Sequence, residues 1–311
     1  MSELNRTHDP ARRSWVERAN LAGGDFPIQN LPFGVFRNAD GARTGIAIGD
    51  HILDLSATLA AGLFDGEARD AAHLASGASL NALMAAGNRM ASALRARLSD
   101  LLWSDGRDAP RARQVADRLL VPMAGAEMLL PVKLGSFTDF LTSIYHTERG
   151  GRVTRPDNPV PPAFKYLPIA YNGRATSVRA SAEPVRRPNV QWRNPEGKVE
   201  FGPCRQLDFE LEVGMYVATG NALGEPISIE HAPDHMFGLC LLNDWSAPLG
   251  ERARPVSQQE PVDDRVAMGR DHRSTCAVSG ASVRATAGRS GTAFLSALAF
   301  GSGHGRLRHR A

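Results

Sequence analysis

The clearest pattern of apolar and polar positions is the alternation at residues 207–213, Leu-Asp-Phe-Glu-Leu-Glu-Val. Strict alternation is typical of a β-strand with one buried face, because successive side chains point to opposite faces. Asp208, Glu210 and Glu212 then share one face, and the apolar residues share the other, which we expect to be buried. Three carboxylates on one strand face repel each other unless a cation lies among them. The stretch alone therefore leaves two alternatives, an oxygen-rich site for Mg²⁺ or Ca²⁺ and a solvated acidic edge strand.

The first third of the chain changes from a strand pattern to a helix pattern. Residues 26–56 hold three short apolar runs separated by Asn, Asp and Gly turn sequences, which predicts a small β-barrel. Over residues 67–103, Ala, Leu and Met recur at helical spacing, and Gly77 and Gly87 interrupt them, so we expect two or three helices. The predicted inner face of these helices consists of Ala82, Leu83, Ala85, Met90, Leu94 and Leu98.

A second β-rich region is predicted from about residue 129 to residue 245. It includes 163–171, the acidic strand, and an apolar run at 236–243 that fits a buried strand or helix, with a hairpin loop at 220–224. The expected fold class is α+β, mostly β. We divide the chain into an N-terminal barrel with helices, the second β-rich region, and a tail, at residues 1–125, 126–247 and 248–311.

Composition and charge narrow the functional classes. The 311 residues include three cysteines and no CxxC pair, which favours a reducing, cytoplasmic setting over a zinc site or a disulfide framework. No apolar run is long enough to span a bilayer, and the polar start lacks a secretory signal, so we expect no membrane association. Residues 248–311 carry ten Arg and five acidic residues, while the remainder is slightly acidic. The basic pI of about 9.0 therefore reflects the tail, and nucleic-acid binding is an alternative that rests on charge alone.

Four segments contain residues suited to chemistry: 136–146, 167–178, the acidic strand and 242–247. Their Thr-Asp-Phe, Gly-Arg-Ala-Thr-Ser, Leu-Asp-x-Glu-Leu-Glu and Asn-Asp-Trp-Ser-Ala pieces occur in this order. Together they resemble the fumarylacetoacetate hydrolase family, over about residues 20–247. The resemblance implies an N-terminal SH3-like small barrel with helices, followed by a truncated mixed β-roll catalytic domain.

The resemblance also implies a metal site. Asp139, Glu210, Glu212 and Asp244 match the ligands of the family, which holds Mg²⁺ and/or Ca²⁺. This agrees with the physical interpretation of the acidic strand, since two carboxylates two residues apart lie on one face. We assign Asp208, further along that face, a structural role.

The reaction implied by the resemblance is hydrolysis of the carbon–carbon bond of 4-fumarylacetoacetate, a small β-diketo acid, to fumarate and acetoacetate. This is the last step of tyrosine catabolism. His146 matches the general base, and Arg155 and Tyr171 match positions that contact the substrate. Leu141 stands where the animal enzymes have a substrate-contacting tyrosine. Members of the family are homodimers, so we expect a homodimer for the intact protein.

Other histidines and other activities are weaker candidates. His231 and His235 are four apart, a spacing that can bind zinc, but no third ligand is close in sequence, so capping or core roles are expected. Acylpyruvate hydrolases and keto-acid hydratases or decarboxylases are related alternatives. The N-terminal barrel and the segment 171–174 argue against them.

After Ala247 the sequence departs from the family pattern. Residues 248–311 contain no Ile, Lys, Asn, Tyr or Trp. Residues 254–260 and 262–270 can be back-translated so that a frame shifted by one base restores family-like sequence. We interpret the tail as the product of a frameshift between codons 247 and 254. The alternative function is then an inactive remnant that at most binds a divalent cation, without measurable turnover in the presence of Mg²⁺.

Overall fold

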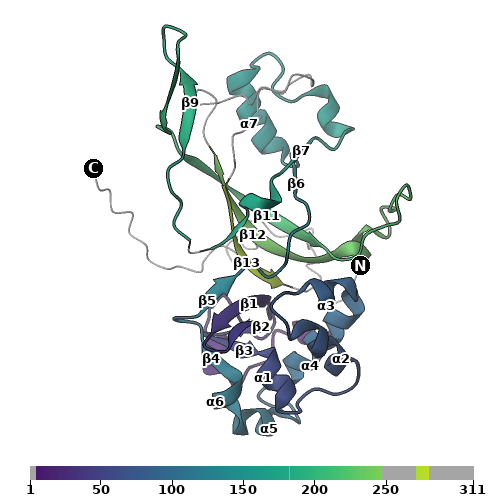
Figure 1. Ribbon diagram of the computed structural model, residues 1–311. Coiled ribbons are helices and arrows are strands. Elements are labelled where there is room, and N and C mark those ends of the chain that lie inside the picture. Colours follow the sequence, from purple (N-terminus) through teal and green to yellow (C-terminus); the bar gives the residue numbers. More distant parts are fainter. Residues whose placement is uncertain (1–4, 182, 247–270, 280–311) are drawn as a thin grey trace.

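A mixed sheet of nine strands runs through the part of the chain that the computed structural model describes, residues 5–181, 183–246 and 271–279 (Figure 1). Seven strands follow one another in the order β11-β12-β13-β1-β2-β3-β4, while β5 pairs with β1 and β8 pairs with β13. The pairing of β8 with β13 is parallel. Helices pack against the β1–β4 part, and β11, β12 and β13 extend away from it (Figure 1).

The first region begins with an antiparallel meander. Its strands are β1 (Phe33–Asn38), β2 (Gly41–Ile48), β3 (His51–Asp54), β4 (Leu120–Pro122) and β5 (Glu127–Leu129). The three predicted runs are therefore strands, as expected. At the first turn, Gly41 adopts a φ of 108°, and the Asp40 N–H donates to Asn38 Oδ1. A left-handed φ explains why this turn carries a glycine. Since β5 pairs with β1, the second β-rich region starts later than residue 129.

In the sequence, the helices of this region lie between β3 and β4, which are neighbours in the sheet. They are α1 (Leu55–Ala60), α2 (Gly66–Ala75), α3 (Asn81–Ala85), α4 (Asn88–Leu102), α5 (Ala109–Gln114) and α6 (Ala116–Leu119), preceded by the short 3₁₀ helices η1 (Arg6–His8) and η2 (Glu17–Asn20). The interruptions at Gly77 and Gly87 are confirmed, since Gly87 (φ 86°) separates α3 from α4. The predicted inner face is wrong at Ala82 and Ala85, which are exposed. A kink at a left-handed glycine resets the helical phase, so one stripe does not continue from α3 into α4.

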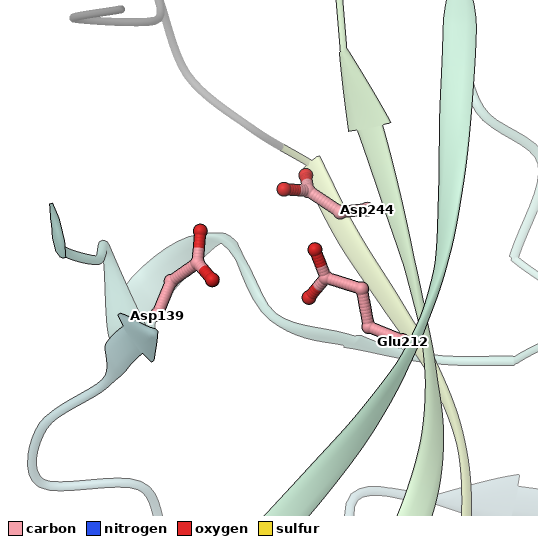
Figure 2. Close-up of side chains that lie close together, drawn as sticks. All are labelled: Asp139, Glu212 and Asp244. Atoms are coloured by element: carbon pink, nitrogen blue, oxygen red, sulfur yellow. The ribbon is translucent and has the colours of Figure 1, made fainter. Parts of the chain in front are cut away.

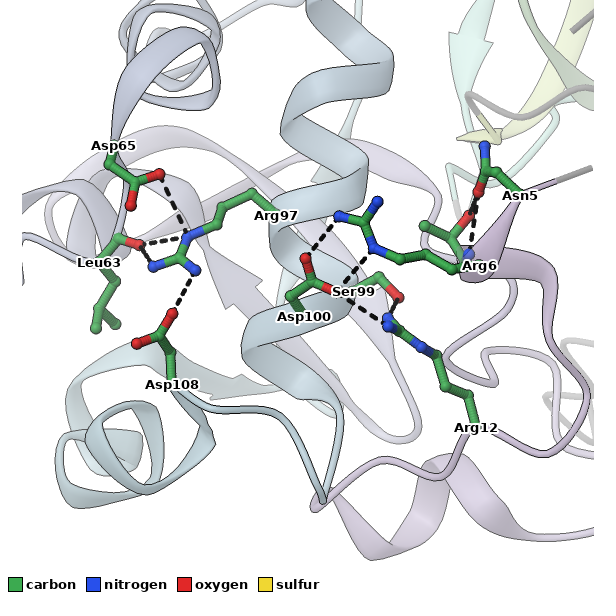
Figure 3. Close-up of polar contacts among 10 residues, drawn as sticks. Asn5, Arg6, Arg12, Leu63, Asp65, Arg97, Ser99, Asp100 and Asp108 are labelled. Atoms are coloured by element: carbon green, nitrogen blue, oxygen red, sulfur yellow. Dashed lines mark hydrogen bonds and ion pairs between the residues drawn. The ribbon is translucent and has the colours of Figure 1, made fainter.

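The core of this region is continuous. Phe33, Ile46, Leu55, Leu83 and Leu94 are fully buried in one cluster of apolar side chains. Polar contacts hold the rim of the cluster, where Asp100 accepts hydrogen bonds from both Arg6 and Arg12 (Figure 3). Arg97 donates to the Leu63 carbonyl and forms an ion pair with Asp108 (Figure 3).

The second region has shorter elements and two small sheets. The elements are β6 (Thr138–Phe140), α7 (Ile144–Thr154), η3 (Pro162–Lys165), β7 (Ala170–Asn172), η4 (Ala175–Ser177), β8 (Arg179–Ala180), β9 (Asn189–Arg193), β10 (Val199–Pro203), β11 (Asp208–Val217), η5 (Ala232–His235) and β12 (Met236–Ser246). Strands β6 and β7 form one two-stranded sheet, and β9 and β10 form the other. The stretch 163–171, expected to be β, is a 3₁₀ turn followed by the short strand β7.

The acidic strand forms as predicted but presents its faces differently. β11 pairs with β12 in an antiparallel hairpin, so the apolar run at 236–243 is a strand. Glu210 and Glu212 are half-buried, whereas the apolar side chains of β11 are 51–63 % exposed: Phe209, Leu211, Val213, Met215 and Val217. The expectation that the apolar face is buried is therefore wrong for the described chain. The period of two identifies which residues share a face, but neighbouring elements decide which face is covered.

Strand β13 (Asp271–Ser279) lies in the predicted tail and joins the two parts of the sheet. It pairs with β12 over most of its length, and Val278 pairs with Phe33 of β1. The other residues of the predicted tail, 248–270 and 280–311, lie outside the described residues, as does residue 247. Within the part of the chain that the structure describes, no helix combines the length and apolar character needed to cross a membrane.

Candidate functional site

Three carboxylates from three different strands point toward one another (Figure 2). They belong to Asp139 of β6, Glu212 of β11 and Asp244 of β12, and one oxygen of each lies within 4.8 Å of the others. The side chain of Asp244 is completely buried, and the other two are half-buried. Three of the four predicted metal ligands are thus brought together by the fold.

Asp139 is held by the small β6–β7 sheet. It lies directly opposite Tyr171, and the ladder continues on both sides, since the Leu141 N–H donates to the Ile169 carbonyl and the Gly173 N–H to the Phe137 carbonyl. A Cβ on Gly173 would lie 1.7 Å from the Phe137 ring. The glycine therefore permits the close approach that closes this sheet next to Asp139.

The register of β11 and β12 positions the other two carboxylates. Asp244 lies opposite Glu210, and Glu212 lies opposite Leu242. Glu210 is on the same face as Glu212 because the two residues are two apart, but it is not among the three clustered groups. Asp208 lies opposite Ser246, and its Oδ1 accepts from the Phe209 N–H at 2.8 Å.

The donor set fits a hard divalent cation. Ionised carboxylates within a few ångströms of each other repel, and the repulsion is stronger where one of them, Asp244, has no access to water. Carboxylate oxygens are the ligands that hard divalent cations prefer. The cluster offers these oxygens from three rigid strands, so a divalent cation would convert the repulsion into coordination.

The remaining predicted site residues lie on β7 and α7. Ser143 caps the N-terminus of α7, where its Oγ accepts from the His146 N–H at 3.2 Å. The imidazole of His146 is exposed. Arg155 caps the C-terminal end of α7, and its Nε is buried with no hydrogen-bond partner among the residues the structure describes. A guanidinium in this state is available to an anionic group.

Comparison with known proteins decides the family. A model described as "Fumarylacetoacetase N-terminal" matches residues 29–131, and one described as "Fumarylacetoacetate (FAA) hydrolase C-terminal" matches residues 137–298. The chain belongs to the fumarylacetoacetate hydrolase family. The second match extends past residue 247, where the sequence analysis sets a boundary. The three-part division of the chain and the frameshift stay predictions.

Several relatives within the family are closely similar. The chain is 42 % identical to a fumarylacetoacetase of Oryza sativa subsp. japonica over 76 % of its own length and 56 % of the relative. It is 39 % identical to that of Mus musculus, covering 81 % and 59 %, and 40 % identical to that of Homo sapiens, covering 72 % and 54 %. The chain thus spans somewhat more than half the length of these relatives.

Solved structures show a weaker likeness. Maleylpyruvate hydrolase from Sphingobium sp. SYK-6 aligns over 78 % of this chain and 65 % of its own, with 17 % identity and a TM-score of 0.39.

The histidines at the η5 turn make ordinary contacts. His235 Nδ1 donates to the Thr219 carbonyl at 2.6 Å, and His231 Nδ1 lies 3.2 Å from Asp234 Oδ2. Neither histidine is buried, so the core role is not seen, and both make local polar contacts at the turn. Sequence reasoning missed the pair formed by Phe137 and Gly173, although the glycine of the Gly-Arg-Ala-Thr-Ser piece was a signal for a close approach.

Proposed function

We propose that this member of the fumarylacetoacetate hydrolase family hydrolyses the carbon–carbon bond of 4-fumarylacetoacetate to fumarate and acetoacetate, the last step of tyrosine catabolism. The observation that carries the proposal is the convergence of Asp139, Glu212 and the fully buried Asp244. The relatives named fumarylacetoacetase support the choice of substrate.

Asp139, Glu212 and Asp244 would hold the metal ion, Mg²⁺ or Ca²⁺, with Glu210 as a fourth ligand. Glu210 is included because it lies opposite Asp244 and on the same strand face as Glu212. When bound, such an ion supplies Lewis-acid and template chemistry for the diketone oxygens.

His146 would act as general base. Its imidazole accepts a proton from the water that attacks one carbonyl of the β-diketone, which is typically worth about 10²–10⁴ in rate. A new C–O bond forms, the C–C bond breaks, and the leaving carbon departs as an enolate that then takes up a proton. The position of His146 in the first turn of α7, seven residues after Asp139 in the chain, supports this role.

Arg155 and Tyr171 would bind the substrate. Arginine suits a carboxylate because its planar fork donates two parallel hydrogen bonds, and the buried Nε of Arg155 has no partner among the described residues. Tyr171 lies opposite Asp139 in the β6–β7 ladder, which places its phenol on the same face as that carboxylate. The side chain of Leu141 has no hydrogen-bonding group, and it stands where the animal enzymes carry a tyrosine.

The proposal includes the finer architecture expected for the family. We assign the β1–β5 meander to an SH3-like barrel and the second region to part of a mixed β-roll. We also propose a homodimer of the intact protein and a cytoplasmic location.

Turnover with matched variants tests the proposal. The purified chain is incubated with fumarylacetoacetate and Mg²⁺, and loss of the diketone absorbance is followed with and without EDTA. Asp244→Asn should abolish turnover, whereas Asp234→Asn, at an exposed aspartate outside the cluster, should leave it unchanged. Measurable turnover at equal rates in wild type and Asp244→Asn would contradict the proposed site.

A second candidate function is a remnant that binds a divalent cation without turnover. The observation that favours it is the apolar face of β11, more than half exposed among the described residues, since an uncovered sheet face is a liability for folding. Ion binding that depends on Asp244, measured without any turnover, would select this candidate.

A further inference from the structure

In the middle of α4, far in sequence from the carboxylate cluster, Arg95 is a buried arginine with no acidic partner in the part of the chain that the structure describes. Arg95 is only 4 % exposed. Its Nη2 donates to the Gln29 carbonyl. Its Nε and Nη1 are buried and have no hydrogen-bond partner among the residues that the structure describes. Two of its three guanidinium nitrogens are therefore unsatisfied.

Arg95 keeps its positive charge despite burial. Burial lowers the pKa of Arg95 to about 10, which leaves the guanidinium protonated at neutral pH. A buried charge without a counter-ion is among the costliest groups a protein interior can hold. Other carboxylates of this region are engaged elsewhere: Asp100 accepts from Arg6 and Arg12 (Figure 3), and Asp9 accepts from the Ala11 N–H.

His8 adds a second unsatisfied donor. Its Nδ1 accepts from the Asn5 N–H at 3.1 Å, so the proton of the neutral ring is on Nε2. That Nε2 is buried and without a hydrogen-bond partner in the described part of the chain. Burial, followed by the nearby charge of Arg95, lowers the pKa of His8, so the ring is neutral at pH 7.

Gln29 links Arg95 to the chain segment that follows His8. Its backbone carbonyl accepts from Arg95, and its side-chain amide donates to the carbonyls of Asp9 and Arg12. The chain segment that follows His8 is thereby held next to the residue that Arg95 contacts. Both unsatisfied groups are hydrogen-bond donors, and one carries a full positive charge. A water molecule can accept such hydrogen bonds but cannot neutralise the charge.

We propose that Arg95 and His8 form a buried binding site for a small monovalent anion, either a halide or a small carboxylate. The site is separate from the carboxylate cluster and does not depend on the proposed catalytic function. Its ligand would stabilise the first region by neutralising the guanidinium.

Anion-dependent stability tests the proposal. Thermal unfolding of the full chain is measured in potassium gluconate, chloride, bromide and acetate at constant ionic strength. Above the Kd of the anion, each tenfold rise in its concentration should raise the folding equilibrium constant about tenfold. Stabilisation by the halides or by acetate supports the site and identifies its ligand.

Variants of the same helix provide the control. Arg95→Met should remove the anion dependence, and Arg89→Met, which removes an exposed arginine of α4 that pairs with Glu67, should retain it. His8→Phe should weaken binding of the anion several-fold. The same anion dependence in wild type and Arg95→Met, or none in wild type, would overturn the proposal.

A direct measurement complements the stability data and does not need a reversible transition. Wild-type chain should broaden the ³⁵Cl NMR line of free chloride, and acetate or bromide should reverse the broadening if they share the site. His8→Phe should broaden the line less. Equal broadening by wild type and His8→Phe, together with equal broadening by Arg95→Met, would also overturn the site.

Discussion

The two regions of the molecule cover their apolar side chains to different extents. In the first region, strands β1–β5 and helices α1–α6 close around one cluster of fully buried residues. Of the large apolar side chains that the structure describes as exposed, all but three lie after residue 136; the three are Leu21, Leu74 and Met128. The comparison indicates that the first region buries most of its core with its own elements, and that Tyr216, Phe237 and Cys240 of β11 and β12 complete the cluster. The second region supplies the chemistry, but its described residues leave the apolar face of β11 uncovered.

Replacing one leucine by alanine in each region should give the largest difference in the free energy of unfolding. Leu94→Ala, at a fully buried position of α4, should lower the free energy of unfolding by about 2–5 kcal/mol through loss of contacts and a cavity. Leu211→Ala, at a position of β11 that is 63 % exposed, should change it by less than about 0.5 kcal/mol. Urea unfolding followed by far-UV circular dichroism measures both. Similar losses in the two variants would show that β11 is covered in solution.

The second-largest loss of stability is expected at the polar contacts around Asp100 in the first region. Asp100→Asn removes the carboxylate that pairs with the buried Arg12 and with Arg6, and should cost about 1–3 kcal/mol because Arg12 is left unpaired. Desolvation raises the pKa of Asp100, but the hydrogen bonds from Arg6 and Arg12 outweigh it, so the pKa is lowered overall.

The lowered pKa fixes the pH dependence of that effect. A depressed carboxyl pKa contributes stability that is present above the unfolded value of about 3.9 and is lost as pH falls through the folded value. Unfolding of wild type and Asp100→Asn should therefore differ by a constant amount above about pH 5, and the difference should shrink as the pH falls through the folded pKa. A difference that does not shrink in acid would assign the effect to packing.

Divalent ions should bind to the carboxylate cluster of the second region, and the first region should not contribute to this binding. Asp244→Asn should weaken Mg²⁺ or Ca²⁺ binding at least about tenfold, or 1.4 kcal/mol. Isothermal titration of wild type and the variant measures this loss of affinity, with Asp234→Asn as the matched control. Equal affinity in wild type and Asp244→Asn would contradict the site.

The smallest effect concerns the helix that carries His146. Ser143→Ala removes the N-cap of α7 and should cost about 1 kcal/mol. If the second region unfolds locally before the first, hydrogen exchange of the α7 amides should rise while that of α4 stays unchanged. Uniform acceleration in both helices would show that the regions unfold together.

Sequence patterns predicted the positions of helices and strands better than they predicted which faces of these elements are buried. The turn glycines and short apolar runs located β1–β3, and Gly77 and Gly87 divided the helices correctly, because backbone conformation at these positions is a local property. The inner face proposed across Gly87 failed because helical phase is lost there. The burial of β11 failed because the cover of a sheet face depends on elements distant in sequence.

The candidate site shows the same limit. Alternation indicated that Glu210 and Glu212 share a face, and the family resemblance added Asp139 and Asp244. Only the β11–β12 register and the β6–β7 sheet bring Glu212, rather than Glu210, into the cluster with those two. Arg95 and His8 carried no sequence signal, since a buried arginine in an amphipathic helix has the same spacing as an exposed one.

The pairing of β13 has a consequence for synthesis on the ribosome. Strands β1–β5 all lie within the first 129 residues, but residues 271–279 insert between β12 and β1. At about 5–20 residues per second, roughly 7–28 s separate translation of Leu129 from that of Asp271. During this interval the nascent chain presents the strand edges that β13 later occupies, and these edges can pair with other chains. The speed of translation between these two points therefore sets how long these strand edges wait for β13.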